Sequence, residues 1–223
     1  MGSNNTRLSP RQKMINLMYI VLTAMLALNV SSDVLNGFTQ VEEGLKRTNN
    51  NVEQRNAAIL NTLEAFAAQN PDKGQRWYDK ATEVRRVTDR IYTQIDSLKH
   101  LIVQRADGDD ADLNNILNRD DLEAASVVML SGPNPQGKKL RTAIEAYRTY
   151  IGSLMADSVK RKSIETALST DPVLIKGTLG KQSWEESKFN TQPVVAAVTL
   201  LTKLQNDVKY AEGEALQTLL ANV

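Results

Sequence analysis

A nearly complete phosphate-binding motif stands out among the residues that could do chemistry. Residues 132–139 read GPNPQGKK and approach the pattern G-x-x-x-x-G-K-[ST]. Lys139 stands where that loop needs a hydroxyl residue for magnesium, and Pro133 and Pro135 remove backbone N–H donors that should hold phosphate. The stretch therefore favours a turn between two helices over nucleotide binding.

Metal and nucleophile chemistry have little support. Residues 107–112 read DGDDAD, but they lack the glycine and the closing glutamate that a calcium loop needs at fixed spacings. His100 is the lone histidine and there is no cysteine, so thiolate and multi-histidine metal sites within one chain are excluded. We expect a solvated turn at residues 107–112, a surface or capping role for His100, no cofactor and no catalytic residue.

The charge balance argues against nucleic acid as a partner. The chain has 27 Lys and Arg against 26 Asp and Glu, giving a net charge of +1. The basic run at residues 159–162 is short and is expected to form a solvated helix face. Trp77, Tyr78 and Trp184 are expected in the core or as loop anchors rather than in a ligand site.

The N-terminal stretch has the pattern of a membrane helix. Arg7, Arg11 and Lys13 precede an uncharged apolar run at residues 14–30, and the first acidic residue of the chain is Asp33. A membrane-spanning helix needs roughly 20 apolar residues, with about 17 as the lower limit. The basic residues place the N-terminus in the cytoplasm. The sequence thus predicts a cytoplasmic N-terminus, a transmembrane helix and a domain beyond the membrane over residues 1–13, 14–33 and 34–223.

A signal peptide is the main alternative for this stretch. Val30-Ser31-Ser32 resembles a cleavage site of small residues, but the apolar run exceeds the usual length of about 7–15 residues. A retained anchor is therefore favoured, with Ser9 as its cap and Pro10 in its first turn. The span has no ionisable residue, so a proton-carrying carboxylate inside the membrane would have to belong to another chain.

Helical periodicity continues through most of the remaining chain. Apolar residues recur at spacings of three, four and seven, and glycine and proline separate the periodic segments. We expect the first helix to continue unbroken from the membrane to Gln69, as a rigid lever. Three further long helices are expected at about residues 75–104, at about 138–168 and from about 193 onward. A short helix is expected at about residues 120–130. Residues 173–190 are expected to be irregular. The predicted fold is all-α, an up-down four-helix bundle, and its final LLANV leads us to expect that the natural protein continues.

The opening residues LSPRQKMINLMY (residues 8–19) and AMLALNVS (residues 24–31) resemble the N-terminus of the GldM/PorM family. Members of that family are inner-membrane motor proteins of the Bacteroidetes type IX secretion and gliding machinery, and the PorM-like branch is favoured here. The resemblance implies one membrane helix, a periplasmic helical bundle, and later β-rich domains that contact outer-membrane components. It also implies a homodimer whose two membrane helices sit in a pentameric ring of a two-helix partner, GldL/PorL, and convert proton flow into rotation.

This resemblance suggests which residues carry the function. Arg11 at the cytoplasmic edge is expected to pair with a carboxylate of the ring, and Lys13 is less favoured because arginine suits buried ion pairs better. Thr23, Ala24 and Ala27 either face lipid without a specific role or allow close packing against other membrane helices. Packing in the membrane is assigned to Met14, Leu17, Met18, Val21, Thr23, Ala24, Met25, Ala27 and Leu28, and the outer edge to Asn29 and Asp33. A passive anchored scaffold and a secreted soluble bundle remain the alternatives.

Overall fold

The computed structural model describes residues 9–28 and 30–223, with side chains for all of these except residues 25–28. Its described part is almost entirely helical, as predicted. The long helices are α1 (Pro10–Leu28), α2 (Ser32–Gln69), α3 (Pro71–Asp107), α5 (Gln136–Leu154) and α8 (Val194–Ala221). Shorter elements are η1 (Gly108–Asp110), α4 (Ala124–Leu130), α6 (Ser158–Ala167), α7 (Trp184–Phe189) and the two-residue strands β1 (Val173–Leu174) and β2 (Lys181–Gln182).

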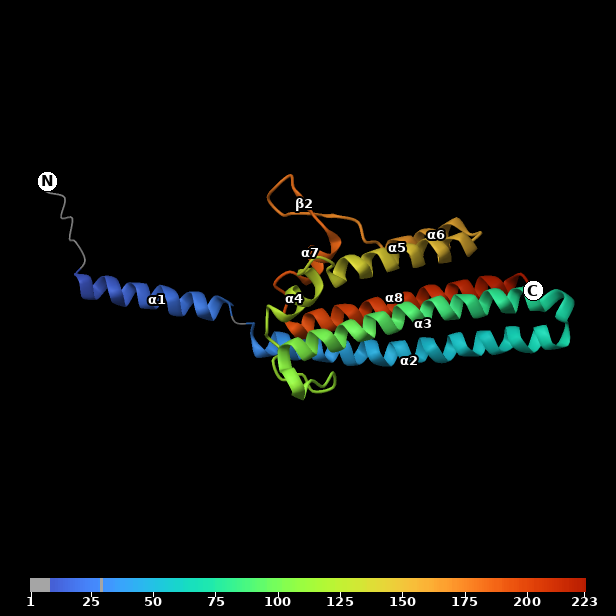
Figure 1. Cartoon of the computed structure of the whole chain (residues 1–223), viewed down its shortest axis with the longest axis horizontal. Helices are drawn as coiled ribbons and strands as arrows, with labels where there is room; N and C mark the ends of the chain where they lie inside the picture. The colour runs from blue at the N-terminus through green and yellow to red at the C-terminus, as the bar shows by residue number, and fades with distance from the viewer. Residues whose placement is uncertain (1–8, 29) are drawn as a thin grey trace.

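Three long helices, α2, α3 and α8, lie side by side, and α5 and α6 cover one side of them (Figure 1). Helices α2 and α8 run in the same direction. Two hydrogen bonds show this: Asn49 Nδ2 donates to the Thr202 carbonyl, and seven residues further along both helices Asn56 Nδ2 donates to the Lys209 carbonyl. The expected up-down order of four helices is therefore wrong. After α5 the chain turns back through α6 and the hairpin, so α8 starts at the same end as α2 (Figure 1).

The expected unbroken helix from the membrane stretch to Gln69 is also wrong. Ser31 has extended backbone angles (φ −64°, ψ 145°), and its hydroxyl accepts the N–H of Val34 at 3.4 Å, so α2 starts anew with its own N-cap. Helix α1 starts as predicted, with the Ser9 hydroxyl accepting the N–H of Gln12 at 3.2 Å. Within the described residues, no helix combines the length and the apolar character needed to cross a membrane.

Two further boundaries differ from expectation. The helix expected at about residues 138–168 is split into α5 and α6, because the Asp157 carboxylate accepts the N–H groups of Val159 and Lys160 and caps a new helix. The stretch expected to be irregular holds the β1–β2 hairpin and α7. Helix α7 is started by a capping box in which Ser183 and Glu186 exchange hydrogen bonds.

The apolar core lies mainly between α3, α4, α5, α7 and α8. Its largest fully buried side chains include Ile95, Ile144, Phe189 and Leu201, and Trp184 packs edge-on against Phe189 with ring centroids 5.9 Å apart. Helix α2 differs from the other long helices of the bundle. Among its 38 residues, the buried apolar side chains are Leu35, Leu63 and Ala67. Half-buried apolar residues of α2, among them Ile59 and Leu60, also pack against the core, and buried polar side chains add to this attachment.

Candidate functional site

A row of buried side chains at seven-residue spacing runs along α2. The row consists of Leu35, Glu42, Asn49, Asn56 and Leu63, and its three middle members are polar. Seven residues make two turns of a helix, so these side chains form one stripe that faces a neighbouring helix. We call Glu42, Asn49 and Asn56, with their partners on α8, the polar seam.

The polar seam joins α2 to α8 in a defined register. Asn49 donates to the Thr202 carbonyl at 3.4 Å, and Asn56 donates to the Lys209 carbonyl at 2.8 Å. Both pairs are separated by 153 positions in the sequence, so successive heptads of the two helices match. Asn56 also donates to the fully buried Glu212 carboxylate at 2.9 Å. Buried amides of this kind hold the two helices in register, since a shift by less than a whole heptad would leave them unpaired.

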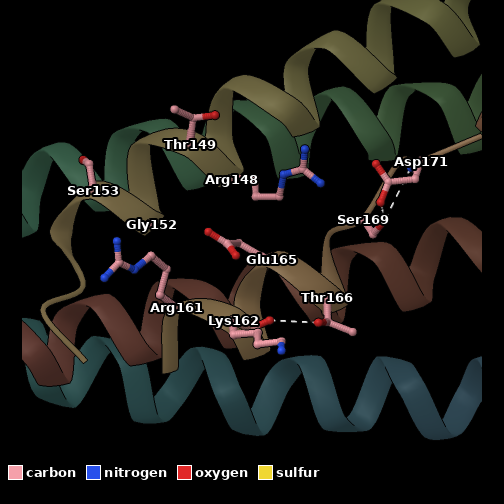
Figure 2. A pocket seen from close by; sticks show the side chains of 10 residues that line it. All are labelled: Arg148, Thr149, Gly152, Ser153, Arg161, Lys162, Glu165, Thr166, Ser169 and Asp171. Carbon is pink, nitrogen blue, oxygen red and sulfur yellow. Dashed lines mark hydrogen bonds between the residues drawn. The ribbon is translucent and has the colours of Figure 1, made fainter. Parts of the chain in front are cut away.

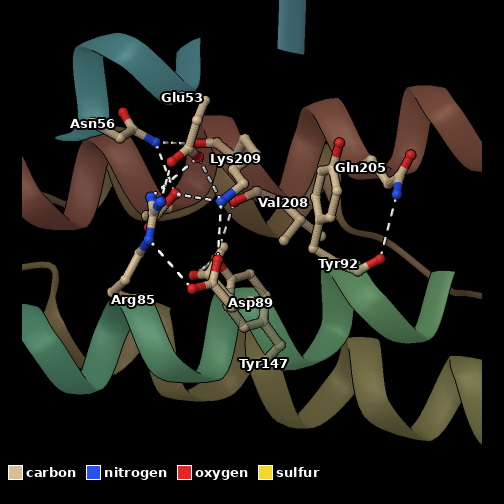
Figure 3. A network of polar contacts seen from close by, with 11 residues as sticks. Glu53, Asn56, Arg85, Asp89, Tyr92, Tyr147, Gln205, Val208 and Lys209 are labelled. Atoms are coloured by element: carbon tan, nitrogen blue, oxygen red, sulfur yellow. Dashed lines mark hydrogen bonds and ion pairs between the residues drawn. The ribbon is translucent and has the colours of Figure 1, made fainter. Parts of the chain in front are cut away.

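Next to Asn56, five charged side chains from three helices meet in what we call the charge cluster (Figure 3). The Lys209 ammonium of α8 lies 2.8 Å from Glu53 on α2, 3.2 Å from Asp89 on α3 and 3.4 Å from Glu212 on α8. The Arg85 guanidinium of α3 contacts Glu53, lies 3.1 Å from Glu212 and lies 3.3 Å from Asp89. Two cations thus share three carboxylates, and every one of the three helices contributes.

Electrostatics favour the ionised forms within the charge cluster. Burial lowers the pKa of Lys209, but the neighbouring Glu212 and Glu53 outweigh burial and raise it above its ordinary value. Burial raises the pKa of Glu53, but hydrogen bonds from Arg85 and Lys209 outweigh it and hold that pKa below 4.5. Lys209 on α8 and Glu53 on α2 therefore stabilise each other's ionised forms, which makes the cluster a clamp between the two helices.

Helix α5 is attached to the same region through Tyr147. The Tyr147 hydroxyl donates to the Val208 carbonyl at 3.0 Å and lies 2.9 Å from the Thr88 hydroxyl. Burial raises the pKa of Tyr147 strongly, so the phenol stays protonated and able to donate. Tyr147 thus extends the clamp to a fourth helix.

An open pocket of about 750 Å³ lies between α5 and α6 (Figure 2). Arg148, Arg161 and Lys162 bring positive charge to it, and Glu165 and Asp171 bring negative charge. Part of the basic run that was expected to be a solvated helix face therefore lines this wall. Figure 2 shows these side chains spread around the rim rather than gathered on one point, so the pocket has no defined binding centre.

A family model for the GldM N-terminal domain matches residues 33–222, which is most of the chain. The chain belongs to the GldM family. Comparison with curated proteins gave no match. Family membership connects the chain to the inner-membrane-associated gliding and type IX secretion machinery, where it works as one component of a complex. The matched range is the part that holds the polar seam and the charge cluster, and α1 precedes it.

The residues expected to pair or pack at the membrane lie on α1 of this GldM chain, apart from the charge cluster, whereas Asp33 lies on α2. Arg11 and Lys13 are exposed in its first turns and take part in no ion pair within the described residues. The described packing residues are also exposed, namely Met14, Leu17, Met18, Val21, Thr23 and Ala24. Asp33 is exposed in the first turn of α2. The expectations for the side chains of Met25, Ala27 and Leu28, and for Asn29, fall outside the described part. The roles assigned to all these residues stay predictions.

Several other motifs take the places that the sequence indicated. Residues 131–135 form the turn before α5, as expected for GPNPQGKK, and Gly132 adopts a positive φ of 86° there. The Asp107 carboxylate accepts the N–H groups of Leu117 and Asn118 at 2.9 and 2.8 Å, so it closes a turn. His100 is exposed beside Asp96. The charge cluster and the polar seam were not predicted, although the seven-residue spacing of Glu42, Asn49 and Asn56 was a readable signal.

Proposed function

We propose that this GldM-family chain is the drive-shaft subunit of a rotary motor, powered by proton flow, that energises type IX secretion or gliding. Helix α1 would lie in the inner membrane with the N-terminus in the cytoplasm, and residues 34–223 would lie in the periplasm. Two copies would engage a pentameric ring of a GldL/PorL-type membrane protein. The observation that carries the proposal is the contrast between α1, in which no side chain of residues 10–24 is buried, and α2, which is clamped into the bundle.

Helix α1 supports a location among lipids and partner helices. No side chain of residues 10–24 is buried, and the exposed ones include an almost continuous run of large apolar residues at Met14, Ile15, Leu17, Met18, Tyr19, Ile20, Val21 and Leu22. Consecutive positions cover every side of a helix, and soluble monomers rarely expose such a surface. Because its apolar part is short, the proposal places α1 inside a ring of helices, with Arg11 and Lys13 reaching the headgroup level.

Arg11 is the proposed coupling residue. It is exposed on α1 and available to pair with a ring carboxylate, whose proton affinity it would lower. Two copies of Arg11 cannot engage five equivalent carboxylates at once, so protonation of one and release of another would move the favoured pairing around the ring. One charge that crosses about 100 mV supplies about 2.3 kcal/mol, and several charges per turn would drive a mechanical step.

Transmission would follow from the short joint between α1 and α2. Only residues 29–31 separate the two helices, and directly beyond them α2 is held to α3 and α8 by the polar seam and the charge cluster. Rotation of α1 would therefore turn the bundle as one body. The same joint favours a second candidate function, a passive membrane-anchored scaffold. A break between α1 and α2 would also suit a chain that only tethers the bundle to the membrane.

Native mass spectrometry with the two-helix partner tests the assembly. The chain and the partner are expressed together, purified in mild detergent and weighed intact. A complex of two copies with five partner subunits supports the motor, whereas a monomer or a dimer that ignores the partner refutes it. Arg11→Ala should then abolish motor-dependent secretion, while Lys13→Ala, two residues further along the same helix, should retain most of it. Secretion that is unaffected by Arg11→Ala would remove the pairing mechanism.

An insertion at the joint separates a shaft from a tether. A flexible Gly-Ser segment placed between Val30 and Ser31 lengthens the joint without touching the α2 cap, because Ser31 and its contact to Val34 are kept. A drive shaft should lose secretion with this insertion although the complex still forms. The same segment inserted in the exposed loop at residues 132–134 is the matched control. Full secretion with both insertions would favour the passive scaffold.

A further inference from the structure

The β1–β2 hairpin is the most exposed feature of the bundle. Every residue from 171 to 181 is exposed, and Leu179 is fully so. The hairpin is nevertheless ordered by its backbone, since Ile175 donates to the Gly180 carbonyl at 3.0 Å and Thr178 donates to the Ile175 carbonyl at 3.2 Å. Gly177 supplies the positive φ of 81° that this turn requires. The turn is therefore held by its backbone, and its side chains are exposed.

The exposed side chains of the hairpin are apolar and basic. Large apolar residues are exposed at Val173, Leu174, Ile175 and Leu179. Lys176 and Lys181 lie among them, and no acidic residue occurs between positions 171 and 185. An exposed group of aliphatic side chains with lysines and without acids is the composition that binds anionic lipid surfaces, where apolar burial and charge attraction add.

The base of the hairpin is rigid. Directly after β2 the capping box starts α7, Trp184 is buried, and the Glu185 carboxylate accepts from Arg141 of α5 at 3.0 Å. Gly137 at the start of α5 allows this close approach, because a Cβ atom there would lie 2.8 Å from the Glu185 side chain. The tip therefore projects from a fixed point on the bundle.

The hairpin projects sideways at the end of the bundle from which α1 leaves (Figure 1). We propose that its tip, Leu174, Ile175 and Leu179 with Lys176 and Lys181, docks on the anionic phospholipid surface of the membrane that holds α1. This inference rests on the proposed function, which places α1 in that membrane. A protein partner that adds a strand is less suited, because β1 and β2 have two residues each and offer almost no edge for pairing.

The contact would limit tilting of the bundle about its short joint. A bundle held only at residues 29–31 would lean freely, whereas a second point of contact with the membrane restricts the lean. A fluid lipid surface resists lift-off of the tip but lets it slide sideways. Rotation about the membrane normal thus stays possible.

The absence of cysteine makes a site-specific test direct. Leu179→Cys, labelled with an environment-sensitive dye, is prepared in the full chain and reconstituted into vesicles of phosphatidylcholine with or without phosphatidylglycerol. Val159→Cys is the matched control, because Val159 is also exposed but lies on α6, away from the hairpin. We expect a blue-shifted, severalfold brighter signal at position 179 in anionic vesicles, with quenching by nitroxide lipids, and no change at position 159.

The arms of the experiment distinguish the possible failures. Lys176→Glu with Lys181→Glu should return the dye to its aqueous signal while the chain still floats with the vesicles. A dye at position 179 that stays aqueous in floating vesicles overturns the hairpin proposal and leaves the anchor intact. A chain that fails to float removes the anchor, and with it the proposed function and this inference. A dye that changes only when the two-helix partner is added in detergent assigns the tip to protein instead.

Discussion

Replacement of Lys209 by methionine is expected to loosen the attachment of α2 more than any surface change. The Lys209 side chain is 4% exposed, and its ammonium contacts Glu53, Asp89 and Glu212. Methionine keeps the length of the side chain and removes the charge. The fully buried Glu212 is then left with Arg85 and Asn56 alone.

The size of the effect follows from how buried each partner is. Removal of one member of a buried ion pair costs about 3–5 kcal/mol when the other charge stays buried without compensation. Here Glu212 keeps Arg85 and Asn56 as partners, which reduces the cost. Glu53 and Asp89 are partly in water, with side chains 36% and 54% exposed, so most of the effect comes from Glu212. We therefore expect the lower end, a loss of about 3 kcal/mol in the free energy of unfolding.

Urea unfolding of the full chain in mild detergent, followed by circular dichroism, measures this loss. A change of about 3 kcal/mol should lower the midpoint by about 1 M urea. Arg86→Met is the control, because Arg86 pairs with Glu83 three residues away on the same helix and both side chains are about half exposed. It should shift the midpoint far less, because an exposed ion pair adds little to stability. Combining Lys209→Met with Glu212→Gln should recover part of the loss. Equal effects of Lys209→Met and Arg86→Met would refute the clamp.

Four further changes test other parts of the bundle. The pKa of Glu53 is held below 4.5, so its contribution to stability is present above that pH and is lost as pH falls through the folded-state pKa. In urea melts at several pH values, acid should therefore destabilise the natural chain more than it destabilises the Glu53→Gln variant. Tyr147→Phe removes hydrogen bonds to α8 and α3 and should lower the free energy of unfolding by about 1–2 kcal/mol in the same melts. Gly74→Ala should lower the thermal midpoint, because its Cβ would lie 2.7 Å from the α2 backbone, with a loss of about 1–3 kcal/mol. A Cβ atom added at Gly44 would have no neighbour within 4 Å, so Gly44→Ala should raise the thermal midpoint, with a gain of up to about 1 kcal/mol in the free energy of unfolding.

Residues that end or start helices, such as proline, made several of the helix boundaries predictable. Asn70-Pro71 ends α2 and Pro193 starts α8, in both cases where the sequence indicated, whereas α3 starts at Pro71, four residues before the expected start at about residue 75. The two wrongly joined helices share one cause. Ser31 and Asp157 are strong N-caps inside segments whose apolar periodicity continues on both sides, and periodicity alone does not register a cap.

The direction of α8 and the charge cluster could not be read from the sequence. The direction depends on how residues 155–193 return the chain, and apolar spacing carries no information about that path. The charge cluster combines Glu53, Arg85, Asp89, Lys209 and Glu212 from three distant segments. Each of them alone looks like an ordinary charged residue on a helix surface, and only the register of α2 and α8 brings them together.

The same register explains why α2 carries polar groups where apolar ones would pack more simply. Parallel helices with a seven-residue repeat can slip by one heptad and keep their apolar contacts. A slip by seven residues in one direction would place Lys46 where Glu53 meets Arg85 and Lys209, and three cations would then face one another. A slip in the other direction would place Leu60 there and remove the only carboxylate that α2 supplies to the cluster. Both slips are therefore opposed by charge, and a force applied along α2 through the joint at residues 29–31 reaches α8 without loss of position.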